Sequence, residues 1–382
     1  MTKKIAIFHP WIKSRGGAEK TVLEILKNMK NAELYTWVYE KEKTFEEFQN
    51  FKINLIGAKF LRKFSRFNLL RGMFLLNCLF SKIPLEKYDL FLISTSGLAE
   101  FIIFRNYKPG KTYAYVYTPL REASKDIVSW NLKNRHRGFL SKVGYLTAVK
   151  IYRFLEKLAW KKIDVAMFIS ELSLERAKER KLIDARKTKI VHPPTNIEDF
   201  GNVKTKNKGY FFYPSRINNP KRQDLLIKAW EEFIKKHPKE KLIIAGSLEN
   251  ENYFNKIRKL AKETKNVEIK TNLSQKELLI LYKECKAVIF VPFMEDFGIV
   301  PFEALSLGKP LIAVDKGGYV GLIGNIPQYY RIRELFSEEE MIKEINRVME
   351  IFLKSKIIPK KIKYPQYNAH NFINNLNKIL EQ

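Results

Sequence analysis

Short apolar runs alternate with helical patterns along most of this chain of 382 residues. In the C-terminal half the candidate strands lie at Tyr210–Tyr213, Lys241–Ala245, Ala287–Val291 and Pro310–Val314. The third of these is apolar at every position, as expected of a strand that is covered on both faces. Helical patterns lie between the strands, and this alternation is typical of a parallel sheet with crossover helices. We therefore predict a doubly wound α/β sheet in this half.

Two helix ends in the same half carry their own signals. Ser274 and Glu277 have the spacing of a capping box, which predicts the start of a helix that runs through Tyr282. A further helix from about Val300 is expected to end at Gly308, because glycine tolerates the backbone conformation that closes a helix.

The N-terminal half shows the same alternation less regularly. Its candidate strands lie at Ile5–Phe8, Leu90–Ser94, Thr112–Val116 and Val165–Ile169. Apolar positions three or four apart after the first strand indicate a helix that packs one face on a sheet. Since the chain is too long for one ordinary core, we expect a second α/β domain here.

The two domains are expected to meet near Val191-His192-Pro193-Pro194, because two prolines stiffen a connection and cannot lie in a central strand. We therefore assign residues 1–194 to an N-terminal domain and residues 195–345 to a C-terminal domain. Residues 346–382 are expected to form a C-terminal helical segment that packs back on the N-terminal domain.

The charge of the chain is lopsided, with 70 Lys and Arg against 41 Asp and Glu and a formal net charge of +29. Such a field attracts nucleic acid, anionic bilayers or phosphorylated small molecules, unless the excess only reflects a Lys-rich source. Cys78 and Cys285 form neither a disulfide framework nor a metal-ligand spacing. No apolar run reaches the roughly 20 residues of a membrane span, and the run after Met1 is too short for a signal peptide. We expect a cytoplasmic protein that can lie peripherally on the inner face of the cell membrane.

The segment with the most chemistry runs from Phe293 to Leu305, just after a candidate strand. Open α/β sheets bind ligands at that end of their strands. Glu295 and Glu303 stand there with seven residues between them, so the two carboxylates could hold two different polyols. Gly298 allows close approach of the backbone, and the amides at the start of the following helix suit an anion. Each glutamate taken alone is equally consistent with a solvated charge.

In each half, one further loop of interest follows the first strand. Arg216 and Lys221 lie five positions apart, where Arg can clamp phosphate oxygens and Lys supplies a compact charge. Gly16-Gly17 forms a turn into a helix, without the three spaced glycines of the dinucleotide fingerprint. No two aspartates stand as Asp-x-Asp, so the sequence lacks that metal-chelating motif.

In their order along the chain, these segments resemble the family 4 retaining glycosyltransferases. Enzymes of that family have the GT-B fold, in which two facing Rossmann-like domains enclose a cleft. The resemblance rests on "EDFGIVPFEAL", "SRINNPKRQDLLIKAW", "GGAEK", "VHPPTN" and "YVYTPLR", and it covers nearly the whole chain. It implies an enzyme that moves a sugar from a nucleotide-sugar donor with no metal ion and no other cofactor.

The resemblance also implies roles on the donor side. Arg216 and Lys221 would hold the diphosphate and stabilise it as it leaves. Glu295 would bind the transferred sugar, and Glu303 would bind the ribose. The other residues implied at the donor are Phe297, Gly298, Gly16 and Gly17, the last two from the opposite domain.

On the acceptor side the resemblance implies Tyr117 and Arg121. Relatives usually have a histidine at the position of Tyr117, and tyrosine with an ordinary pKa is a poor base near neutral pH. Gly321 stands where relatives often carry a glutamate. These two departures leave open an inactive relative that only binds sugars or nucleotides. His9, after the first strand, faces either the cleft or the core.

Relatives with a "YTPLR"-like loop often use GDP-mannose, so the resemblance implies mannosyl transfer first, with UDP-glucose and UDP-N-acetylglucosamine as open alternatives. The implied acceptor is a glycan or a lipid-linked glycan. Basic, aromatic stretches at Phe60–Leu85 and Lys133–Lys162 suit either interfacial helices on an anionic membrane surface or ordinary amphipathic helices that pack inward.

Other functions explain less of the chain. A basic nucleic-acid-binding protein would account for the charge, but it gives no purpose to the glutamate pair, and the chain has no helix-turn-helix, zinc or RNA-recognition signature. We therefore expect no nucleic-acid partner. Another enzyme on the same architecture, such as a phosphorylase or an epimerase, stays open because a fold does not decide a reaction.

Overall fold

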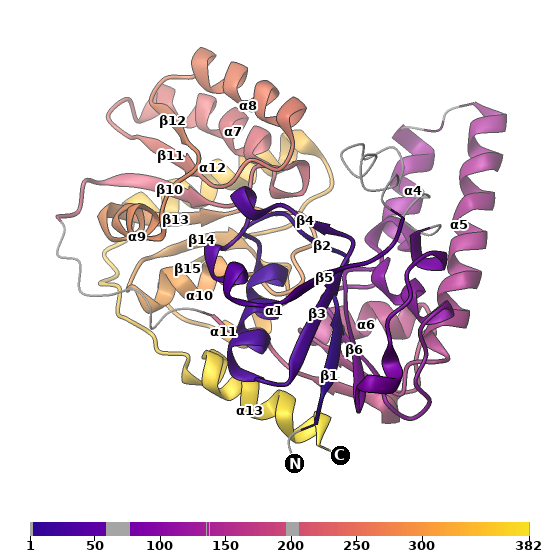
Figure 1. The fold of residues 1–382 in the computed structure, drawn as a ribbon. Coiled ribbons are helices and arrows are strands. Elements are labelled where there is room, and N and C mark those ends of the chain that lie inside the picture. The colour runs from indigo at the N-terminus through magenta and orange to yellow at the C-terminus, as the bar shows by residue number, and fades with distance from the viewer. Residues whose placement is uncertain (1–2, 59–76, 135, 137, 196–205, 382) are drawn as a thin grey trace. The chain divides into compact units, whose positions relative to one another are not determined.

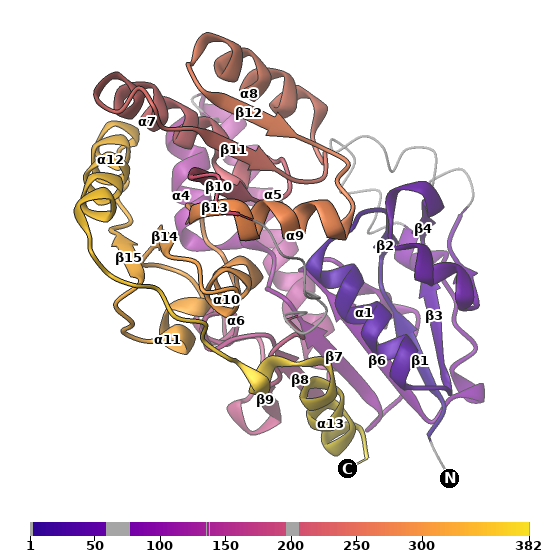
Figure 2. The same cartoon turned by 90° about the vertical axis from the view of Figure 1, so that its left-hand side faces the viewer.

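The computed structural model describes residues 3–58, 77–134, 136, 138–195 and 206–381, and the chain forms two compact units. Unit 1 contains Met1–Pro193 and Phe372–Gln382, and unit 2 contains Pro194–Asn371. Each unit has its own parallel sheet (Figure 1, Figure 2). Of the two basic stretches, residues 59–76, Arg135 and Arg137 lie outside the described residues.

Unit 2 contains a six-stranded parallel sheet in the order β12-β11-β10-β13-β14-β15. Its strands are β10 (Tyr210–Pro214), β11 (Leu242–Ala245), β12 (Val267–Lys270), β13 (Cys285–Phe290), β14 (Leu311–Val314) and β15 (Tyr329–Ile332). The chain order reverses between β10 and β13, which are hydrogen-bonded neighbours. This is the strand order of a doubly wound nucleotide-binding sheet.

Helices cover both faces of this sheet. They are α7 (Gln223–Lys236), α8 (Glu251–Glu263), α9 (Gln275–Glu284), α10 (Ile299–Ser306), α11 (Tyr319–Ile323) and α12 (Glu338–Lys354). Figure 2 shows α7, α8 and α12 on one face and α9, α10 and α11 on the other. The first face holds a large core, in which Trp230 and Phe233 pack edge-on against Phe211 of β10.

Unit 1 contains a seven-stranded parallel sheet in the order β5-β3-β1-β6-β7-β8-β9, with its own reversal between β1 and β6. The strands are β1 (Ile5–Phe8), β3 (Ala32–Thr36), β5 (Ile53–Leu55), β6 (Leu90–Thr95), β7 (Thr112–Val116), β8 (Val165–Phe168) and β9 (Thr188–Ile190). Two short strands, β2 (Trp11–Ile12) and β4 (Val38–Tyr39), pair separately.

The helices of unit 1 pack around this sheet. They are α1 (Gly17–Asn28), α4 (Lys125–Asn134), α5 (Phe139–Trp160), α6 (Glu171–Glu179) and the C-terminal part of α13 (Ala369–Leu380). The ring of Phe372 in α13 lies 5.8 Å edge-on from Tyr115, and the Leu380 carbonyl accepts a hydrogen bond from Lys3. The chain also has short 3-10 helices, among them η1 (Lys41–Lys43), η2 (Glu46–Asn50), η4 (Leu85–Lys87), η5 (Ala99–Phe104), η6 (Arg121–Ala123), η7 (Ala185–Lys187), η8 (Asn219–Lys221) and η9 (Pro365–Tyr367).

The predicted α/β class is confirmed in both units, and each predicted strand is present within one or two residues. The capping box at Ser274 and Glu277 is also confirmed, as is the end of α10 before Gly308, whose φ is +72°. The pattern did not predict β3 or the four edge strands β5, β9, β12 and β15. Edge strands are short and partly exposed, so they lack the continuous apolar run that marks a central parallel strand.

Gly246, directly after β11, lies against the loop that follows β10. A methyl group on Gly246 would come within 1.9 Å of the Ser215 carbonyl oxygen. We expect Gly246→Ala to lower the free energy of unfolding by about 2 kcal/mol or more, because one of the two backbones must shift. Calorimetry should therefore record a lower unfolding midpoint. Gly144→Ala is the control, since an added methyl on that face of α5 meets nothing within 4 Å and alanine favours a helix. Equal midpoints for the two variants would contradict the close approach.

Candidate active site

The strand reversal in unit 2 brings two loops together at one edge of the sheet. Residues 215–222 follow β10 and carry Arg216 and Lys221, and residues 291–298 follow β13 and carry Glu295. Because β10 and β13 are neighbours, the loops after them start side by side. Open α/β sheets hold their ligands at this position.

Arg216 is held beside the end of β11. Its Nη1 lies 3.0 Å from Oε1 of Glu249, and Asn218 donates to the other oxygen of the same carboxylate. Both side chains of the ion pair are 38% exposed, so water and solutes reach them. The Arg216 carbonyl accepts a hydrogen bond of 2.8 Å from the Gln223 side chain, which fixes the loop backbone.

Lys221 joins the two loops. Its Nζ lies 2.5 Å from Oε2 of Glu295, and the two side chains are only 14% and 17% exposed. The ammonium also lies 5.6 Å from the centre of the Phe290 ring, at the end of β13. Since the Lys221 carbonyl accepts a hydrogen bond from Tyr213, both its backbone and its side chain are held in place.

A second cation fastens the same loops. Arg222 adopts a left-handed φ of +53° and forms an ion pair of 2.8 Å with Glu334. Its guanidinium lies 4.6 Å from the centre of the Phe293 ring. The amide of Phe293 donates to the Pro220 carbonyl at 2.7 Å, so a backbone hydrogen bond also links the loops.

The loop after β14 approaches Glu295 closely because it contains glycines. The amide of Gly318 donates to the Glu295 carbonyl at 3.0 Å, and a methyl group on Gly318 would come within 1.8 Å of the Asp296 carbonyl. Gly298 has a φ of +81° and precedes α10, and a methyl group there would come within 2.6 Å of the Tyr319 ring. A side chain at either position would push the glutamate loop away.

Glu303 lies on α10, where Tyr282 of α9 holds it. The Tyr282 hydroxyl donates to Oε2 of Glu303 at 2.5 Å. Burial raises the pKa of Tyr282 well above its ordinary value, so the phenol keeps its proton and acts as a donor. The sequence places both glutamates in one segment, and the structure gives each a different partner.

The side chain of Phe297 is packed rather than exposed. It is 3% exposed and stacks on Phe302 with 5.2 Å between ring centres, while Tyr367 lies edge-on at 6.0 Å. Only the backbone of Phe297 is therefore available to a ligand at the N-terminus of α10.

In unit 1 the glycine turn and Tyr117 contact each other. Gly16 precedes α1, and Gly17 is its first residue. The Tyr117 hydroxyl donates to the Ala18 carbonyl at 3.0 Å, and Ser94 donates to that hydroxyl at 3.2 Å. Burial raises the pKa of Tyr117 above its ordinary value, so this phenol is a donor and not a base. Arg121 lies four residues after Tyr117, is half-buried and is the first residue of η6.

His9 lies beside Tyr117 at the strand reversal of unit 1. The ring is 2% exposed, and its Nδ1 lies 2.9 Å from Oγ of Ser94. Its Nε2 is buried and has no hydrogen-bond partner among the described residues. Burial lowers the pKa of His9 from 6.5 to about 4, so the ring is neutral near pH 7. His9 is thus a buried histidine with one ring nitrogen hydrogen-bonded and the other without a partner among the described residues.

Two absences concern the described residues alone. Within residues 3–58, 77–134, 138–195 and 206–381, no three or more His, Cys, Asp and Glu side chains are grouped so as to hold a metal ion. In the same part of the chain, no helix is both long enough and apolar enough to cross a membrane.

A model of a known enzyme family matches the C-terminal half of the chain. Residues 194–377 match the family model described as glycosyl transferases group 1. The chain is a glycosyltransferase whose C-terminal half is similar to that family. The matched region contains the loops after β10 and β13, with Arg216, Lys221 and Glu295, and helix α10 with Glu303.

Relatives of this glycosyltransferase include several mannosyltransferases. An alpha-1,3/1,6-mannosyltransferase ALG2 of Kluyveromyces lactis is 23% identical over 99% of this chain and 85% of that protein. The ALG2 of Dictyostelium discoideum is 25% identical over 82% of each chain. A mouse protein named GDP-Man:Man(3)GlcNAc(2)-PP-Dol alpha-1,2-mannosyltransferase is 24% identical over 82% of this chain and 73% of that protein.

Solved structures give the fold of this glycosyltransferase. Anabaena Alr3699/HepE, in complex with UDP-glucose, aligns with a TM-score of 0.69 over 99% of each chain at 16% identity. WaaG, a glycosyltransferase involved in lipopolysaccharide biosynthesis, aligns with a TM-score of 0.61 over 91% of this chain and 90% of that one, at 14% identity. The predicted GT-B fold is confirmed by these likenesses and by the two parallel sheets.

Three residues that hold the site together were not identified from the sequence. Glu249 holds Arg216 from the loop after β11, Tyr282 holds Glu303 from α9, and Phe290 underlies Lys221 from the last position of β13. Only Glu249 could have been nominated, because it too follows the carboxyl end of a strand beside β10.

The buried neutral His9 predicts a loss of stability in acid. Its pKa is lower in the folded chain than in the unfolded chain, so the unfolded chain binds more protons as the pH falls from 6.5 to about 4. We expect the wild type to lose up to about 3 kcal/mol over this window through His9 alone, and His9→Gln to be spared that loss. Thermal unfolding at a series of pH values measures the difference. His370→Gln, which changes an exposed histidine, should follow the wild type; if it matched His9→Gln instead, the assignment to His9 would be wrong.

Proposed function

We propose that this chain is a retaining, metal-independent hexosyltransferase. Its proposed donor is GDP-mannose, and its proposed acceptor is a glycan on a lipid carrier. The names of the mannosyltransferase relatives support the sugar, and the name of the mouse relative supports the GDP donor and the diphosphate-linked lipid. The observation that carries the proposal is the Lys221–Glu295 ion pair at the strand reversal of unit 2, beside Arg216. A sugar diphosphate needs cations at its phosphates and an acceptor for its hydroxyls.

The cations have a defined task in this reaction. Arg216 would leave Glu249 for the diphosphate, which carries more charge than one carboxylate, and Lys221 would contact it from the same loop. Negative charge grows on the diphosphate as the sugar departs, so preplaced cations stabilise the transition state more than the ground state. These two side chains take the role that a divalent metal has in other transferases.

The two carboxylates would bind the two sugars of the donor. Tyr282 fixes the carboxylate of Glu303 on α10, which suits it to accept from the ribose hydroxyls. Lys221 fixes Glu295, which would accept from hydroxyls of the transferred sugar. The backbone amides at Phe297 and Gly298, ahead of α10, would contribute further donors.

The proposed transfer balances without an enzyme nucleophile. The bond between C1 of mannose and the diphosphate oxygen breaks, and its electron pair leaves with GDP. An acceptor hydroxyl oxygen bonds to C1 from the same face, and its proton passes to the leaving diphosphate. Since the mannose of GDP-mannose is alpha-linked and the relatives are named for alpha linkages, this transfer retains configuration.

The acceptor-side residues belong to unit 1. Tyr117 donates to the Ala18 carbonyl, so it would position the turn of Gly16 and Gly17 and would not remove a proton from the acceptor. Arg121, in the loop after Tyr117, is the cation we assign to the acceptor. A lipid-linked acceptor also calls for peripheral membrane contact on the cytoplasmic side, which the net charge of +29 favours.

Donor binding should appear as thermal stabilisation. A nucleotide-sugar at a hundred times its Kd adds about 2.7 kcal/mol to the free energy of unfolding, so GDP-mannose should raise the wild-type midpoint. Glu303→Gln and Arg216→Ala should lose that rise, because each removes a donor contact. Glu251→Gln and Arg258→Ala, both exposed on α8, are the matched controls and should keep it. If UDP-glucose stabilises and GDP-mannose does not, the assigned base and sugar are wrong; if neither does, the donor site is misassigned.

A turnover assay distinguishes a catalytic role of Lys221 from a role in donor binding alone. We expect Lys221→Ala to lower kcat about a hundredfold or more, because it removes charge stabilisation from the departing diphosphate. Lys235→Ala, at an exposed position of α7, should leave kcat unchanged. Transfer from radiolabelled GDP-mannose to a lipid-linked oligosaccharide, run with and without EDTA, is the assay. Loss of wild-type turnover in EDTA would contradict a metal-independent reaction.

A further inference from the structure

Helix α5 exposes an apolar face that nothing in the described chain covers. The helix spans Phe139–Trp160, and its exposed large apolar side chains are Phe139 (78%), Leu140 (82%), Val143 (46%), Leu146 (37%), Ile151 (56%) and Phe154 (63%). At roughly 100° per residue these six positions fall within an arc of about 140°, which we call the outer face of α5. Val149, Glu156, Ala159 and Trp160 are buried on the opposite side. The helix therefore has two apolar faces, of which the chain uses one.

The charges around the outer face are cationic. Lys142, Lys150 and Lys157 are exposed on the same helix. The single acid of α5, Glu156, is fully buried and paired with Arg180. An apolar stripe flanked by lysines matches an anionic lipid surface, where the rings enter the acyl boundary and the ammonium groups meet the headgroups.

Other occupants fit this face less well. A second copy of the chain would bring the same lysines and the same net charge of +29 against it. A bilayer-spanning arrangement is excluded for α5 itself, because the helix is not apolar enough to cross a membrane. Figure 1 shows the N-terminal half of α5 beside α4 and beyond the sheet of unit 1.

We propose that the outer face of α5 docks on an anionic lipid bilayer, and that docking steadies the loop of residues 117–123 that the inner face of this helix holds. This inference rests on the proposed function for the acceptor-side role of the loop, whereas the docking step itself is independent of the donor site and of the sugar transferred. The loop contains Tyr117 and Arg121, the two residues assigned to the acceptor side.

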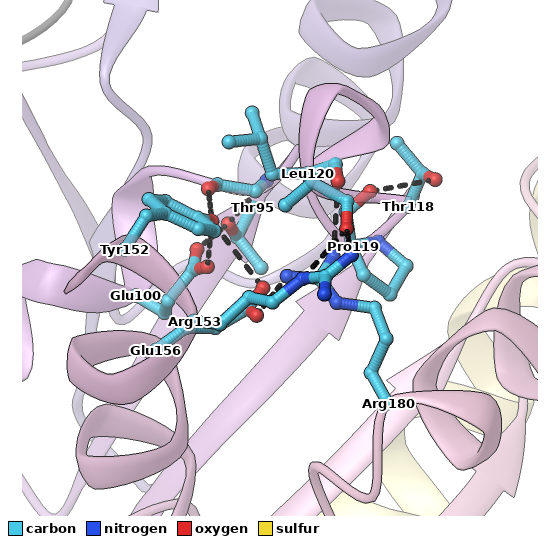
Figure 3. A network of polar contacts seen from close by, with 11 residues as sticks. Thr95, Glu100, Thr118, Pro119, Leu120, Tyr152, Arg153, Glu156 and Arg180 are labelled. Atoms are coloured by element: carbon cyan, nitrogen blue, oxygen red, sulfur yellow. Dashed lines mark hydrogen bonds and ion pairs between the residues drawn. The ribbon is translucent and has the colours of Figure 1, made fainter. Parts of the chain in front are cut away.

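The inner face of α5 contacts that loop directly. Arg153 donates from Nε and Nη2 to the Ala123 carbonyl, at 3.1 and 2.7 Å. Glu156 forms a buried ion pair with Arg180, and Arg180 in turn donates to the Leu120 carbonyl at 2.9 Å. Figure 3 shows these side chains converging on the loop segment that carries Thr118, Pro119 and Leu120.

The network continues from α5 to the end of β6. The Tyr152 hydroxyl donates to the Gly97 carbonyl at 2.5 Å, and Thr95 donates to the buried Glu100 at 2.6 Å. Gly97 has a φ of +102°, and a methyl group on it would come within 2.4 Å of the Leu120 backbone. Hydrogen bonds and close backbone packing thus link the segment after β6 and the 117–123 loop to α5.

Vesicle sedimentation of the full chain tests the docking. We expect binding to phosphatidylcholine vesicles that contain phosphatidylglycerol, weakened by salt, and little binding to phosphatidylcholine alone. The double variant Leu140→Glu/Phe154→Glu should bind at least about tenfold less, because it removes apolar contacts and adds repulsion. Phe336→Glu/Ile358→Glu is the matched control, since these side chains are 99% and 83% exposed in unit 2.

Lysine variants separate charge from apolar contact. Lys150→Ala/Lys157→Ala should weaken vesicle binding roughly fivefold for each lysine, while Lys235→Ala/Lys262→Ala, with the same charge change on α7 and α8, should stay near the wild type. The proposal is overturned if the wild type ignores anionic vesicles, or if control and α5 variants lose binding equally. It is also overturned if the apolar variants abolish a dimer in size exclusion while vesicle binding persists.

Hydrogen–deuterium exchange tests the link to the loop. Amides in residues 117–123 should exchange more slowly when anionic vesicles are added to the wild type. Leu140→Glu/Phe154→Glu should show no such change, whereas Phe336→Glu/Ile358→Glu should behave as the wild type. Unchanged exchange in the vesicle-bound wild type would refute the steadying of the loop.

Discussion

The reversal of strand order in each parallel sheet is the constraint on which the rest of this molecule depends. In unit 2 the chain moves outward from β10 through β11 to β12, and then returns to β13 on the other side of β10. Helices that follow neighbouring strands at such a reversal leave toward opposite faces, so the loops after β10 and β13 separate above the sheet. Lys221 and Glu295 span that separation with a single ion pair. The position of the candidate donor site is therefore a consequence of topology, and its residues follow from which loops meet there.

Cations crowd this edge of unit 2, and acids keep them in place. Arg216, Lys221 and Arg222 lie within seven consecutive residues and are paired with Glu249, Glu295 and Glu334 in that order. Such pairs contribute little to stability where they are exposed, because water already solvates both charges. Their value lies in orientation, since each carboxylate holds a guanidinium or ammonium at a fixed place until a more highly charged anion competes for it. The net charge of the chain then assists by raising the local concentration of that anion.

The sequence predicts the central elements well and the long-range contacts poorly. Strands such as β10 and β13 are apolar at nearly every position, because both faces of a parallel sheet are covered, whereas edge strands such as β12 and β15 include charged residues among the apolar ones. The site loops were predicted because their motifs are local. Tyr282 lies 21 residues before its partner Glu303, and no periodicity joins such a pair. The edge-on contact between Phe297 and Tyr367 could not be predicted for the same reason, since Tyr367 lies in a distant segment.

The pattern of α5 was ambiguous because a helix can be amphipathic toward a core or toward a membrane. Composition could not decide, since cations and aromatic residues alternate on α5 in either case. The structure distinguishes two faces of α5 by their burial. The residues that pack inward form the polar network with the 117–123 loop, whereas Phe139, Leu140 and Phe154 are exposed to solvent. A contiguous exposed apolar face on a protein surface is typical of an interaction site. In the proposed docking, a bilayer would cover this face and would bring a lipid-linked acceptor to the unit that carries Tyr117 and Arg121.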